Sequence, residues 1–380
     1  MALVLATSAC GGSDPAPSAA VATTSAESAI DPTVGAAVLA NTALVAESLY
    51  NSATLAAEQL AGTITAFLAD PTDSTLASAR EEWIVARAAY MPTEALRFSD
   101  GPIDSGLNVE GFINAWPLDE AYIDSLLAAD EPIAAELLRS ANERGGERNI
   151  ATGWHAIEYL LWGVDDDPDG PGDRPAEDFV PAPGLADQRR RYLEVATTML
   201  LDDLTAVRDT WLSGSGQFAA AFVASDSREG IQRVLTGLGT LAGGELYGQR
   251  LAVPYETKDQ EEEHSCFSDN TTADHVGDIE GIRLMYLGLD AQGQPVGGTS
   301  LSALIATVDA AADTSVRTAI DASLAALQSI PAPFDQAFLG PDTEPGRVAI
   351  RTAMTTLTEL TSALVEAATA LGLTIGTDVP

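Results

Sequence analysis

Long Ala- and Leu-rich stretches with helical periodicity dominate this chain, and alternating runs of β-branched residues are almost absent. The first stretch runs from Val34 to about Leu68. Similar patterns cover residues 74–98, 186–213, 226–252, 276–288, 300–329 and 342–372, with shorter ones at 119–128, 131–144 and 152–162. Pro92 is expected to bend the second of these helices. The sequence therefore predicts an all-α protein built from helical bundles.

The chain also contains a sparse internal repeat. The segment FSD at 98–100 is followed by EGFI at 110–113, and FSD at 267–269 is followed at nearly the same spacing by EGIR at 280–283. Glu94 and Glu263 each lie four residues before the Phe. These ordered elements favour two bundles related by internal duplication, with a cleft between them. We place the first bundle at 33–215 and the second at 216–380.

The N-terminus has the pattern of a lipoprotein export signal. A short apolar run with small residues, MALVLATSAC, ends at Cys10, although a basic region is missing because the first Arg or Lys is Arg80. We interpret residues 1–10 as a truncated or atypical lipoprotein-type signal with lipid attached at Cys10, and 11–32 as a flexible linker. The expected protein is exported to the cell envelope or periplasm, monomeric, and held at the membrane only through its lipid anchor.

The charge balance limits the partners. Fifty-six acidic residues against nineteen basic ones give a net charge of −37. Nucleic-acid binding needs a basic surface that neutralises phosphates, so the sequence argues against a nucleic-acid partner. The same negative charge is compatible with a cationic ligand such as a metal ion, although most of it is expected to serve solubility.

The segment GWHAIEYLLWG, residues 153–163, places His155 and Glu158 three residues apart on a helix that is otherwise apolar or aromatic all round. Residues at i and i+3 share a helix face, so the two side chains can reach one metal ion. The alternative is a His that is hydrogen-bonded within the bundle, beside a Glu that pairs with an Arg. The helix is expected to be buried, so both ionisable groups need partners.

Two other segments offer such partners. One has a polar stripe at helical steps of three or four, formed by Arg87, Tyr90, Glu94 and Arg97. This stripe is either a functional face or a solvated face with salt bridges. The other, DQEEEHSCFSDNTTADH at 259–275, groups two histidines with acidic residues: His264, His275, Glu263, Asp269 and Asp274. All three histidines of the chain therefore lie in or next to two short segments, which predicts a site there.

Several common sites do not match. The sequence has no HExxH zinc motif, GxSxG elbow or P-loop. Asp165, Asp167 and Asp169 reproduce the opening of a calcium loop, but its twelfth position is Ala176 instead of Glu, and prolines interrupt the segment. We therefore favour an acidic solvent loop over a calcium site. Cys266 is expected to be a buried, inert thiol.

Four separated motifs together resemble the imelysin-like family, which includes insulin-cleaving metallopeptidases and the iron-regulated protein A group. They are RxxYxxTExxRF at 87–98, NAWPLDE at 114–120, GWHAIEYLLWG at 153–163 and DQEEEHSCFSDNT at 259–271. The last motif points to the iron-regulated group. The family's GxHxxE hallmark is matched by Gly153, His155 and Glu158, and the resemblance extends from about residue 34 to 372.

The resemblance implies two duplicated helical bundles, a site at their interface, and an exported, often lipid-anchored protein connected with iron uptake. It implies His155 and Glu158 as the metal or active-site pair. It also implies five cleft residues: Glu94, Arg97, His264, Ser265 and Asp269. The polar stripe adds Arg87 to this group, and the repeat adds Asp100.

Three functions follow from these observations. In the first, the protein binds a divalent metal ion, with iron favoured and zinc possible, through His155 and Glu158 with help from Glu94 and His264, and works in iron uptake or handling. In the second, it is a metallopeptidase that cleaves extracytoplasmic peptides with Glu158 or Glu94 as general base. A catalytic zinc needs three protein ligands, of which the HxxE pair supplies two. In the third, it is a non-catalytic adaptor for an envelope partner, and its polar cleft binds a peptide or carboxylate through Arg87 and Arg97.

Overall fold

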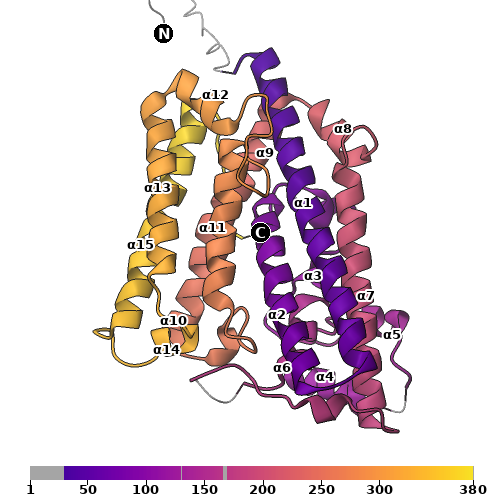
Figure 1. Ribbon diagram of the computed structural model, residues 1–380. Coiled ribbons are helices and arrows are strands. Elements are labelled where there is room, and N and C mark those ends of the chain that lie inside the picture. The colour runs from indigo at the N-terminus through magenta and orange to yellow at the C-terminus, as the bar shows by residue number, and fades with distance from the viewer. Residues whose placement is uncertain (1–29, 130, 166–168, 380) are drawn as a thin grey trace, which may run out of the picture.

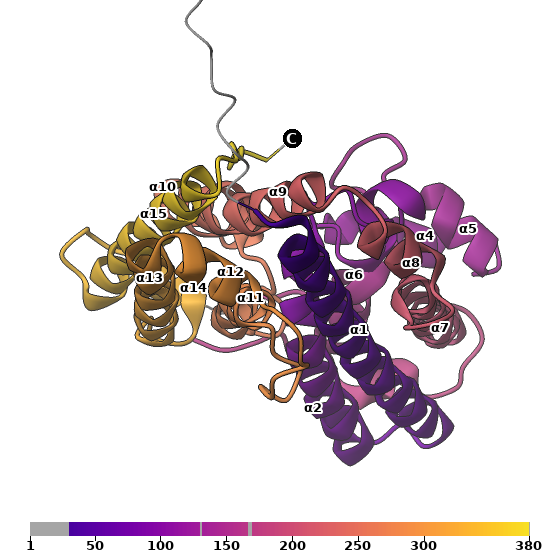
Figure 2. The same ribbon diagram turned by 90° about the horizontal axis from the view of Figure 1, so that it is seen from above.

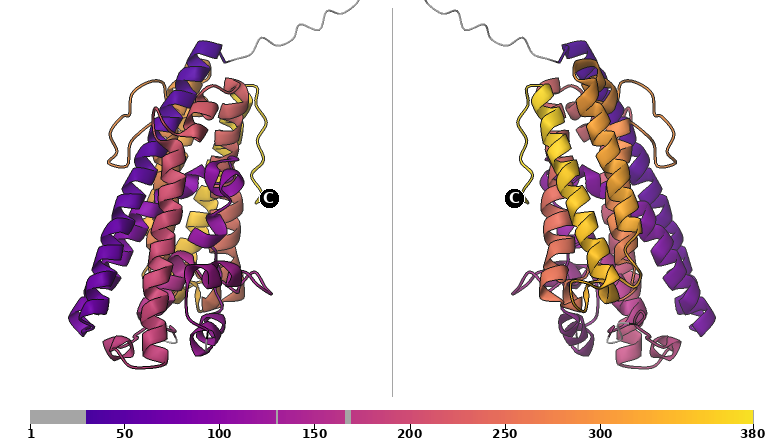
Figure 3. Two further views of the ribbon diagram at one scale, coloured as in Figure 1. Left: turned by 90° about the vertical axis from the view of Figure 1, so that its right-hand side faces the viewer. Right: turned by 90° about the vertical axis from the view of Figure 1, so that its left-hand side faces the viewer.

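The computed structural model describes residues 30–129, 131–165 and 169–379, and the chain in these ranges is built from helices (Figure 1). The only β contact within them is an isolated bridge between Leu289 and Pro295. The all-α prediction is therefore confirmed. Figure 3 shows that the long helices share one approximate direction, so the molecule is elongated along the helix axes.

Three long helices frame the first half of the chain: α1 (Pro32–Ala69), α2 (Asp73–Tyr90) and α7 (Leu185–Trp211). α1 packs against both α2 and α7, and the short helix α6 (Gly153–Trp162) packs against α2 and α7. α1 begins where the Asp31 side chain accepts hydrogen bonds from the Thr33 and Val34 amides. The shorter elements of this half are α3 (Glu110–Ile113), α4 (Glu120–Ala128), α5 (Ala135–Ala141), η2 (Pro102–Gly106) and η3 (Ala176–Phe179).

Except for α8 (Gln217–Val223), which packs against α1 and α7, the second half lies on the opposite side of α1 from α7 when the molecule is seen from above (Figure 2). Its long elements are α9 (Ser227–Thr240), the π-helical continuation η4 (Leu241–Ala252), α11 (Thr271–Leu287), α13 (Ala310–Gln328) and α15 (Pro345–Ala370). α13 packs against α11 and α15, and α15 also packs against η4. The shorter elements are α8 (Gln217–Val223), α10 (Val253–Thr257), η5 (Gln260–Glu262), α12 (Leu301–Val308) and α14 (Phe334–Phe338).

The two halves meet where η1 (Met91–Leu96) crosses α11. Pro92 does not merely bend the predicted helix over 74–98: α2 ends at Tyr90 and a 3-10 turn follows. Glycines on α11 allow this turn to lie directly on the helix. A Cβ added at Gly281 would lie 2.4 Å from the carbonyl oxygen of Pro92, and one at Gly277 would lie 2.5 Å from Cβ of Met91.

Two predicted helices have different bounds in the structure. The pattern over 300–329 is interrupted at Asp309, whose side chain caps α13 by accepting from the Ala311 and Ala312 amides. The helix predicted over 276–288 begins earlier, at Thr271. Its first turns carry Asp274, which is fully buried. Because that buried face is polar, hydrophobic periodicity does not reveal these turns.

The predicted boundary at 215/216 falls between α7 and α8, and α8 packs against α1 and α7. Of the residues matched in the repeat, Asp100 and Asp269 both have a left-handed backbone, with φ of 55° and 58°. Glu94 and Glu263 are both fully buried. The bundle boundaries and the duplication stay predictions.

α1 is the one helix in the described ranges whose length and apolar composition would let it cross a membrane. However, 56% of its most apolar stretch is buried inside the protein. Val38, Leu49, Leu60 and Phe67 belong to the core. α1 is therefore accounted for as a core helix of the first half.

Gly153 begins α6 with φ of 84°, and a Cβ there would lie 2.4 Å from the carbonyl oxygen of Ile113. We expect Gly153→Ala to lower the free energy of unfolding by about 2 kcal/mol or more, because it adds both backbone strain and a clash. The matched control is Gly62→Ala on α1, where nothing lies within 4 Å of an added Cβ. That change is expected to stabilise the helix by about 0.5–1 kcal/mol. Urea denaturation measures the free energy of unfolding of both variants. If both changes stabilise the protein, or both destabilise it, the tight backbone position described for Gly153 is wrong.

Candidate functional site

Helix α6 brings His155 and Glu158 together on one buried face. Nδ1 of His155 lies 2.9 Å from Oε2 of Glu158, and both side chains are buried. The other oxygen of Glu158, Oε1, accepts hydrogen bonds from the backbone amide and the hydroxyl of Ser268, at 3.0 and 2.7 Å. The predicted pair is thus adjacent, and both Glu158 oxygens are engaged.

The second nitrogen of the His155 ring faces an arginine. Nε2 of His155 lies 3.4 Å from Nη2 of Arg87, a fully buried residue of α2. Arginine nitrogens only donate hydrogen bonds, so Nε2 of His155 acts as the acceptor. The proton of the neutral imidazole must then sit on Nδ1, from which it is donated to Glu158.

Burial controls the protonation of this pair. It holds the pKa of His155 well below its ordinary value, and the neighbouring Arg87 charge lowers that pKa further. Burial also raises the pKa of Glu158, but the Ser268 hydrogen bonds, the Arg87 charge and the Nδ1–H of His155 all favour its carboxylate form, which is the form that can accept from all three donors. His155 is therefore a neutral imidazole at neutral pH, consistent with its role as an acceptor from Arg87.

Arg87 connects this pair to the second half of the chain. Its Nη2 lies 2.8 Å from Oδ2 of Asp274 on α11, and its Nε also donates to that carboxylate. The same Nη2 is 3.4 Å from Nδ1 of His264, and Nη1 donates to Oδ1 of Asn114. One guanidinium is therefore shared by groups from four separate segments.

Asp274 in turn positions His264. Its Oδ2 lies 2.9 Å from Nδ1 of His264 and accepts from the Ser265 hydroxyl at 2.7 Å, while Oδ1 accepts from Asn270 at 3.0 Å. Burial favours the neutral acid, but Arg87 and these hydrogen bonds hold the pKa of Asp274 below its ordinary value. Nη2 of Arg87 has two hydrogens, which its contacts with Asp274 and His155 use up, so Nδ1 of His264 donates its proton to the ionised Asp274. This leaves Nε2 of the His264 ring as its acceptor.

Glu94 belongs to a separate network. Its Oε1 accepts from the Tyr90 hydroxyl at 2.7 Å, and its Oε2 lies 2.7 Å from Arg250 and 3.3 Å from Arg97. Burial opposes ionisation, but Arg97 and Arg250 lower the pKa of Glu94 to about 2. Arg250 also pairs with Asp278 on α11 at 2.9 Å. Both oxygens of Glu94 are thus occupied by partners other than His155.

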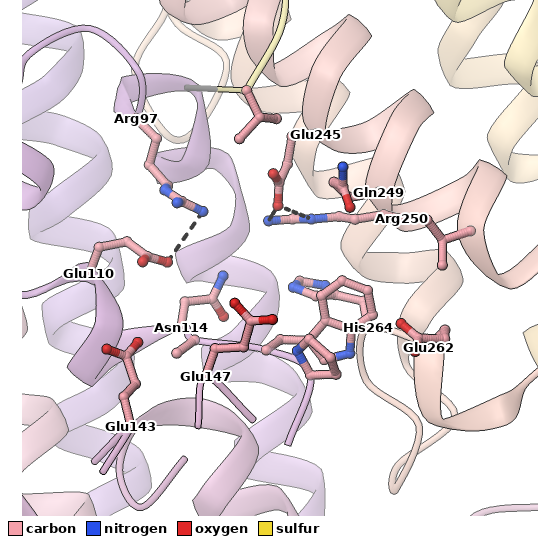
Figure 4. A pocket seen from close by; sticks show the side chains of 15 residues that line it. Arg97, Glu110, Asn114, Glu143, Glu147, Glu245, Gln249, Arg250, Glu262 and His264 are labelled. Atoms are coloured by element: carbon pink, nitrogen blue, oxygen red, sulfur yellow. Dashed lines mark hydrogen bonds and ion pairs between the residues drawn. The ribbon is translucent and has the colours of Figure 1, made fainter. Parts of the chain in front are cut away.

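A cavity of about 410 Å³ opens between the two halves, and we call it the inter-half cavity. Figure 4 shows Arg97, Glu110 and Glu143 on one side of it and Glu245, Arg250 and Glu262 on the other. Its lining is Arg97, Glu110, Asn114, Ala115, Trp116, Pro117, Glu143, Glu147, Glu245, Gln249, Arg250, Val253, Glu262, His264 and Val379. Five glutamates against two arginines make this wall acidic. His264 and Asn114 connect it to the buried Arg87 network.

The predicted metal ligands do not fit a metal chelate as they stand. A positively charged guanidinium lies 3.4 Å from both imidazoles, which is where a metal ion shared by His155 and His264 would have to sit. Glu158 and Glu94 are bonded elsewhere. Across the described ranges, no group of three or more His, Cys, Asp or Glu side chains is arranged to hold a metal ion. Glu158 is also not among the residues that line the cavity.

The other predicted residues are divided between site and surface. Arg87, Arg97 and Ser265 belong to the buried networks, whereas Asp100 is exposed and is not part of the cavity wall. Asp269 is half-buried in the loop that carries Ser268.

The proposed lipidation site lies outside the described ranges, and the possible calcium loop lies partly outside them. Asp165 accepts a hydrogen bond from Gln260, and Asp169 accepts one from Gln336, but Asp167 and Cys10 lie beyond the part of the chain that the structure describes. Cys266 is a buried thiol whose pKa burial raises well above its ordinary value, in line with the expected inert role.

Sequence reasoning missed Arg250 and the central role of Asp274. Arg250 sits in an unremarkable segment, GQRLAVP. Its partner Glu245 is a near neighbour, but its other partners, Glu94 and Asp278, are far away in the chain. One signal was available: in a chain with only nineteen basic residues, an arginine with uncharged neighbours on both sides is informative. Asp274 was noticed only as an acidic neighbour of the histidines.

Comparison with known proteins agrees with the motif-based resemblance. The family model described as imelysin, of peptidase family M75, matches residues 46–364. Iron-regulated protein A from Synechococcus elongatus is 26% identical over 326 residues, covering 83% of this chain and 80% of that protein.

Two crystal structures share the fold. One is described as an iron-regulated protein A precursor from Parabacteroides distasonis, with a TM-score of 0.74 and 21% identity, covering 90% of this chain and 96% of that one. The other is an imelysin-like protein from Psychrobacter arcticum, with a TM-score of 0.68 and 15% identity, covering 91% and 98%. At these identities the likeness establishes the fold alone.

Glu110 is a residue of the cavity wall whose carboxyl group changes its ionisation near neutral pH. It lies 3.2 Å from Arg97. Burial raises its pKa to about 7, and the carboxylates of Glu94, Asp104 and Glu245 add to the rise that Arg97 opposes. The folded protein therefore binds a proton at Glu110 over a pH range in which the unfolded chain has released it. The stability that this proton contributes is complete below about pH 4.5 and is lost as the pH rises through about 7.

We expect Glu110→Gln to reduce the loss of stability between pH 5 and pH 8 by about 1–3 kcal/mol compared with the wild type. Urea denaturation at the two pH values measures this difference. Glu359→Gln, an exposed change on α15, is the matched control and should leave the pH dependence as it is. If the wild type and Glu110→Gln lose the same stability between pH 5 and pH 8, the pKa of Glu110 is not raised as described.

Proposed function

The chain belongs to the imelysin family, and from that premise we propose that it is an iron-handling protein of the cell envelope that binds a cation in the inter-half cavity. The proposal depends on the cavity wall, where five glutamates and His264 surround the space. Both arginines of the wall are already paired, Arg97 with Glu110 and Arg250 with Glu245. A wall of this composition attracts positive charge.

His264 is the imidazole best prepared for a ligand. Its Nδ1 is bonded to Asp274, so the ring is held in one tautomer with Nε2 as the available acceptor. A carboxylate behind an imidazole is the usual support of a metal-binding histidine, because it fixes the ring and makes it a stronger ligand. We propose Glu147 and Glu262, which share the cavity wall with His264, as the carboxylates that would move in to join it when a cation binds, since the described side chains as they stand do not form a three-ligand group.

Iron is the favoured cation, with zinc as the second choice. Carboxylate oxygens with an imidazole suit iron at least as well as zinc. The similarity to a protein named iron-regulated protein A supports a connection with iron. A bound ion would supply a positive charge to the acidic wall, and the residues of this chain would supply its ligands and its orientation.

The envelope location remains part of the proposal. The sequence pattern ending at Cys10 supports export and a lipid anchor, with the membrane reached only through that anchor. An envelope protein or a peptide would then be the partner that delivers or receives the cation, and the protein would work as a monomer.

A metallopeptidase is the competing function within the family. It needs a general base that faces the substrate, whereas Glu158 is buried with both oxygens bonded. Glu147 and Glu262 face the cavity, but no observation singles out either of them as a base. Binding is therefore the proposal, and cleavage of a peptide is an outcome that the experiment must be able to detect.

We expect wild-type protein, purified without chelator or affinity tag, to bind Fe²⁺ anaerobically and Zn²⁺ in air, as measured by titration calorimetry and elemental analysis. Glu147→Gln and Glu262→Gln should each weaken binding by about tenfold or more, since each removes a charged ligand. Glu359→Gln on α15 removes the same charge far from the cavity wall and should have no effect.

Absence of binding to the wild type, or equal affinities in all four proteins, would contradict the proposed site. Cleavage of unstructured peptides that is abolished by a chelator and by Glu147→Gln or Glu262→Gln would favour the metallopeptidase instead.

A further inference from the structure

We propose that the GxHxxE motif of this chain is a clamp for an arginine, Arg87, and that this clamp joins the two halves and fixes His264 at the cavity wall. The motif residues are Gly153, His155 and Glu158. Each of them has contacts that serve the guanidinium, and the clamp does not depend on which ligand the cavity takes.

His155 contacts Arg87 directly. Its Nε2 accepts from Nη2 of Arg87 at 3.4 Å. Glu158 acts one step further away, because its Oε2 accepts the Nδ1 proton of His155 at 2.9 Å and so selects the tautomer that leaves Nε2 bare. Ser268, from the loop before α11, holds Oε1 of Glu158. The second half of the chain therefore fixes the acid that orients the histidine.

Gly153 serves the same guanidinium through the backbone. Because it has no side chain, the carbonyl oxygen of Ile113 can approach to a position 2.4 Å from where a Cβ would be. The next residue, Asn114, accepts from Nη1 of Arg87 through its Oδ1. A side chain at position 153 would push this segment away and remove an acceptor from the arginine.

The surroundings of Arg87 are those of a permanently buried cation. Its Cζ lies 5.9, 5.5 and 5.8 Å from the ring centroids of Trp83, Tyr90 and Trp154. Aromatic faces stabilise a desolvated guanidinium, and Asp274 supplies the compensating negative charge at 2.8 Å. A second cation between the two imidazoles would be repelled by this charge and would have to displace it.

The clamp acts on the cavity through Asp274. Arg87 holds the carboxylate with two of its nitrogens, and the carboxylate takes Nδ1 of His264. His155 and Glu158 are therefore positioning residues: they orient Arg87, which fixes Asp274, which orients His264. None of these steps requires a metal ion at the motif.

Nuclear magnetic resonance of the imidazole nitrogens gives the decisive signature, because the chain has only three histidines. Long-range ¹H–¹⁵N spectra, assigned with His264→Gln and His275→Gln, should show His155 as a neutral ring with its proton on Nδ1 between pH 5.5 and 8. Addition of Zn²⁺ should leave the proton of His155 on Nδ1, although zinc at the neighbouring His264 can shift the His155 signals. A proton on Nε2, titration in this range, or loss of the Nδ1 proton when zinc is added would overturn the clamp.

Substitutions provide an independent test. His155→Gln keeps one acceptor and one donor and is a poor metal ligand, whereas His155→Ala keeps neither. We expect His155→Ala to lower the midpoint of thermal unfolding by about 5 °C or more and His155→Gln to recover at least half of that loss. If His155→Gln is as unstable as His155→Ala, or loses zinc that the wild type binds while remaining folded, the clamp is wrong.

Arg87 itself is tested in a pair of variants, because Arg87→Met alone leaves a buried carboxylate unpaired. The double variant Arg87→Met/Asp274→Asn removes both charges and should unfold at a higher temperature than Arg87→Met. Arg191→Met, which breaks an exposed pair with Glu194, is the matched control and should change the midpoint by less than about 2 °C. If Arg87→Met unfolds at the same temperature as the control Arg191→Met, the proposal is wrong.

Discussion

The guanidinium of Arg87 is a fully buried cation that groups from both halves of the chain have to neutralise and hydrogen-bond. Burying a charge is costly unless it is paired and its donors are satisfied. Asp274 provides the charge, Asn114 accepts from Nη1, and His155 accepts from Nη2, the nitrogen that also contacts Asp274. α2, α6 and α11 must therefore keep their relative positions, since displacement of any one of them would leave part of this charge uncompensated.

Arg250 makes a reciprocal connection. It comes from η4 in the second half and pairs with Glu94 of η1 in the first half and with Asp278 of α11. Arg87 lies in the first half and pairs with α11 one turn away, at Asp274. The two arginines thus fasten opposite halves onto the same helix. The close approach of η1 to α11, which the glycines of α11 allow, brings both connections within reach.

Much of the fold and part of the site could be predicted from the sequence. The periodicity located most long helices, and the i, i+3 spacing correctly placed His155 and Glu158 on one face. Local spacing shows which side chains face the same way, but not what lies opposite them. Arg87 could be listed as a polar residue near Glu94, yet its partner Asp274 is 187 positions away in the chain. Only the three-dimensional packing of the two halves reveals that Arg87 contacts both His155 and His264.

The same packing explains why the cavity is acidic. The chain has nineteen basic and fifty-six acidic residues. The two arginines of the cavity wall, Arg97 and Arg250, each lie close to several carboxylates. Each arginine can neutralise one charge, so an excess of carboxyl groups remains. Part of this excess is relieved by protonation, as the pKa of Glu110 near 7 indicates. The rest faces the cavity on Glu143, Glu147 and Glu262, of which Glu262 also lies 3.5 Å from Arg148. Interface arginines that are saturated by internal acids cannot bind an anionic ligand strongly, and therefore the charge that best completes this cavity is positive.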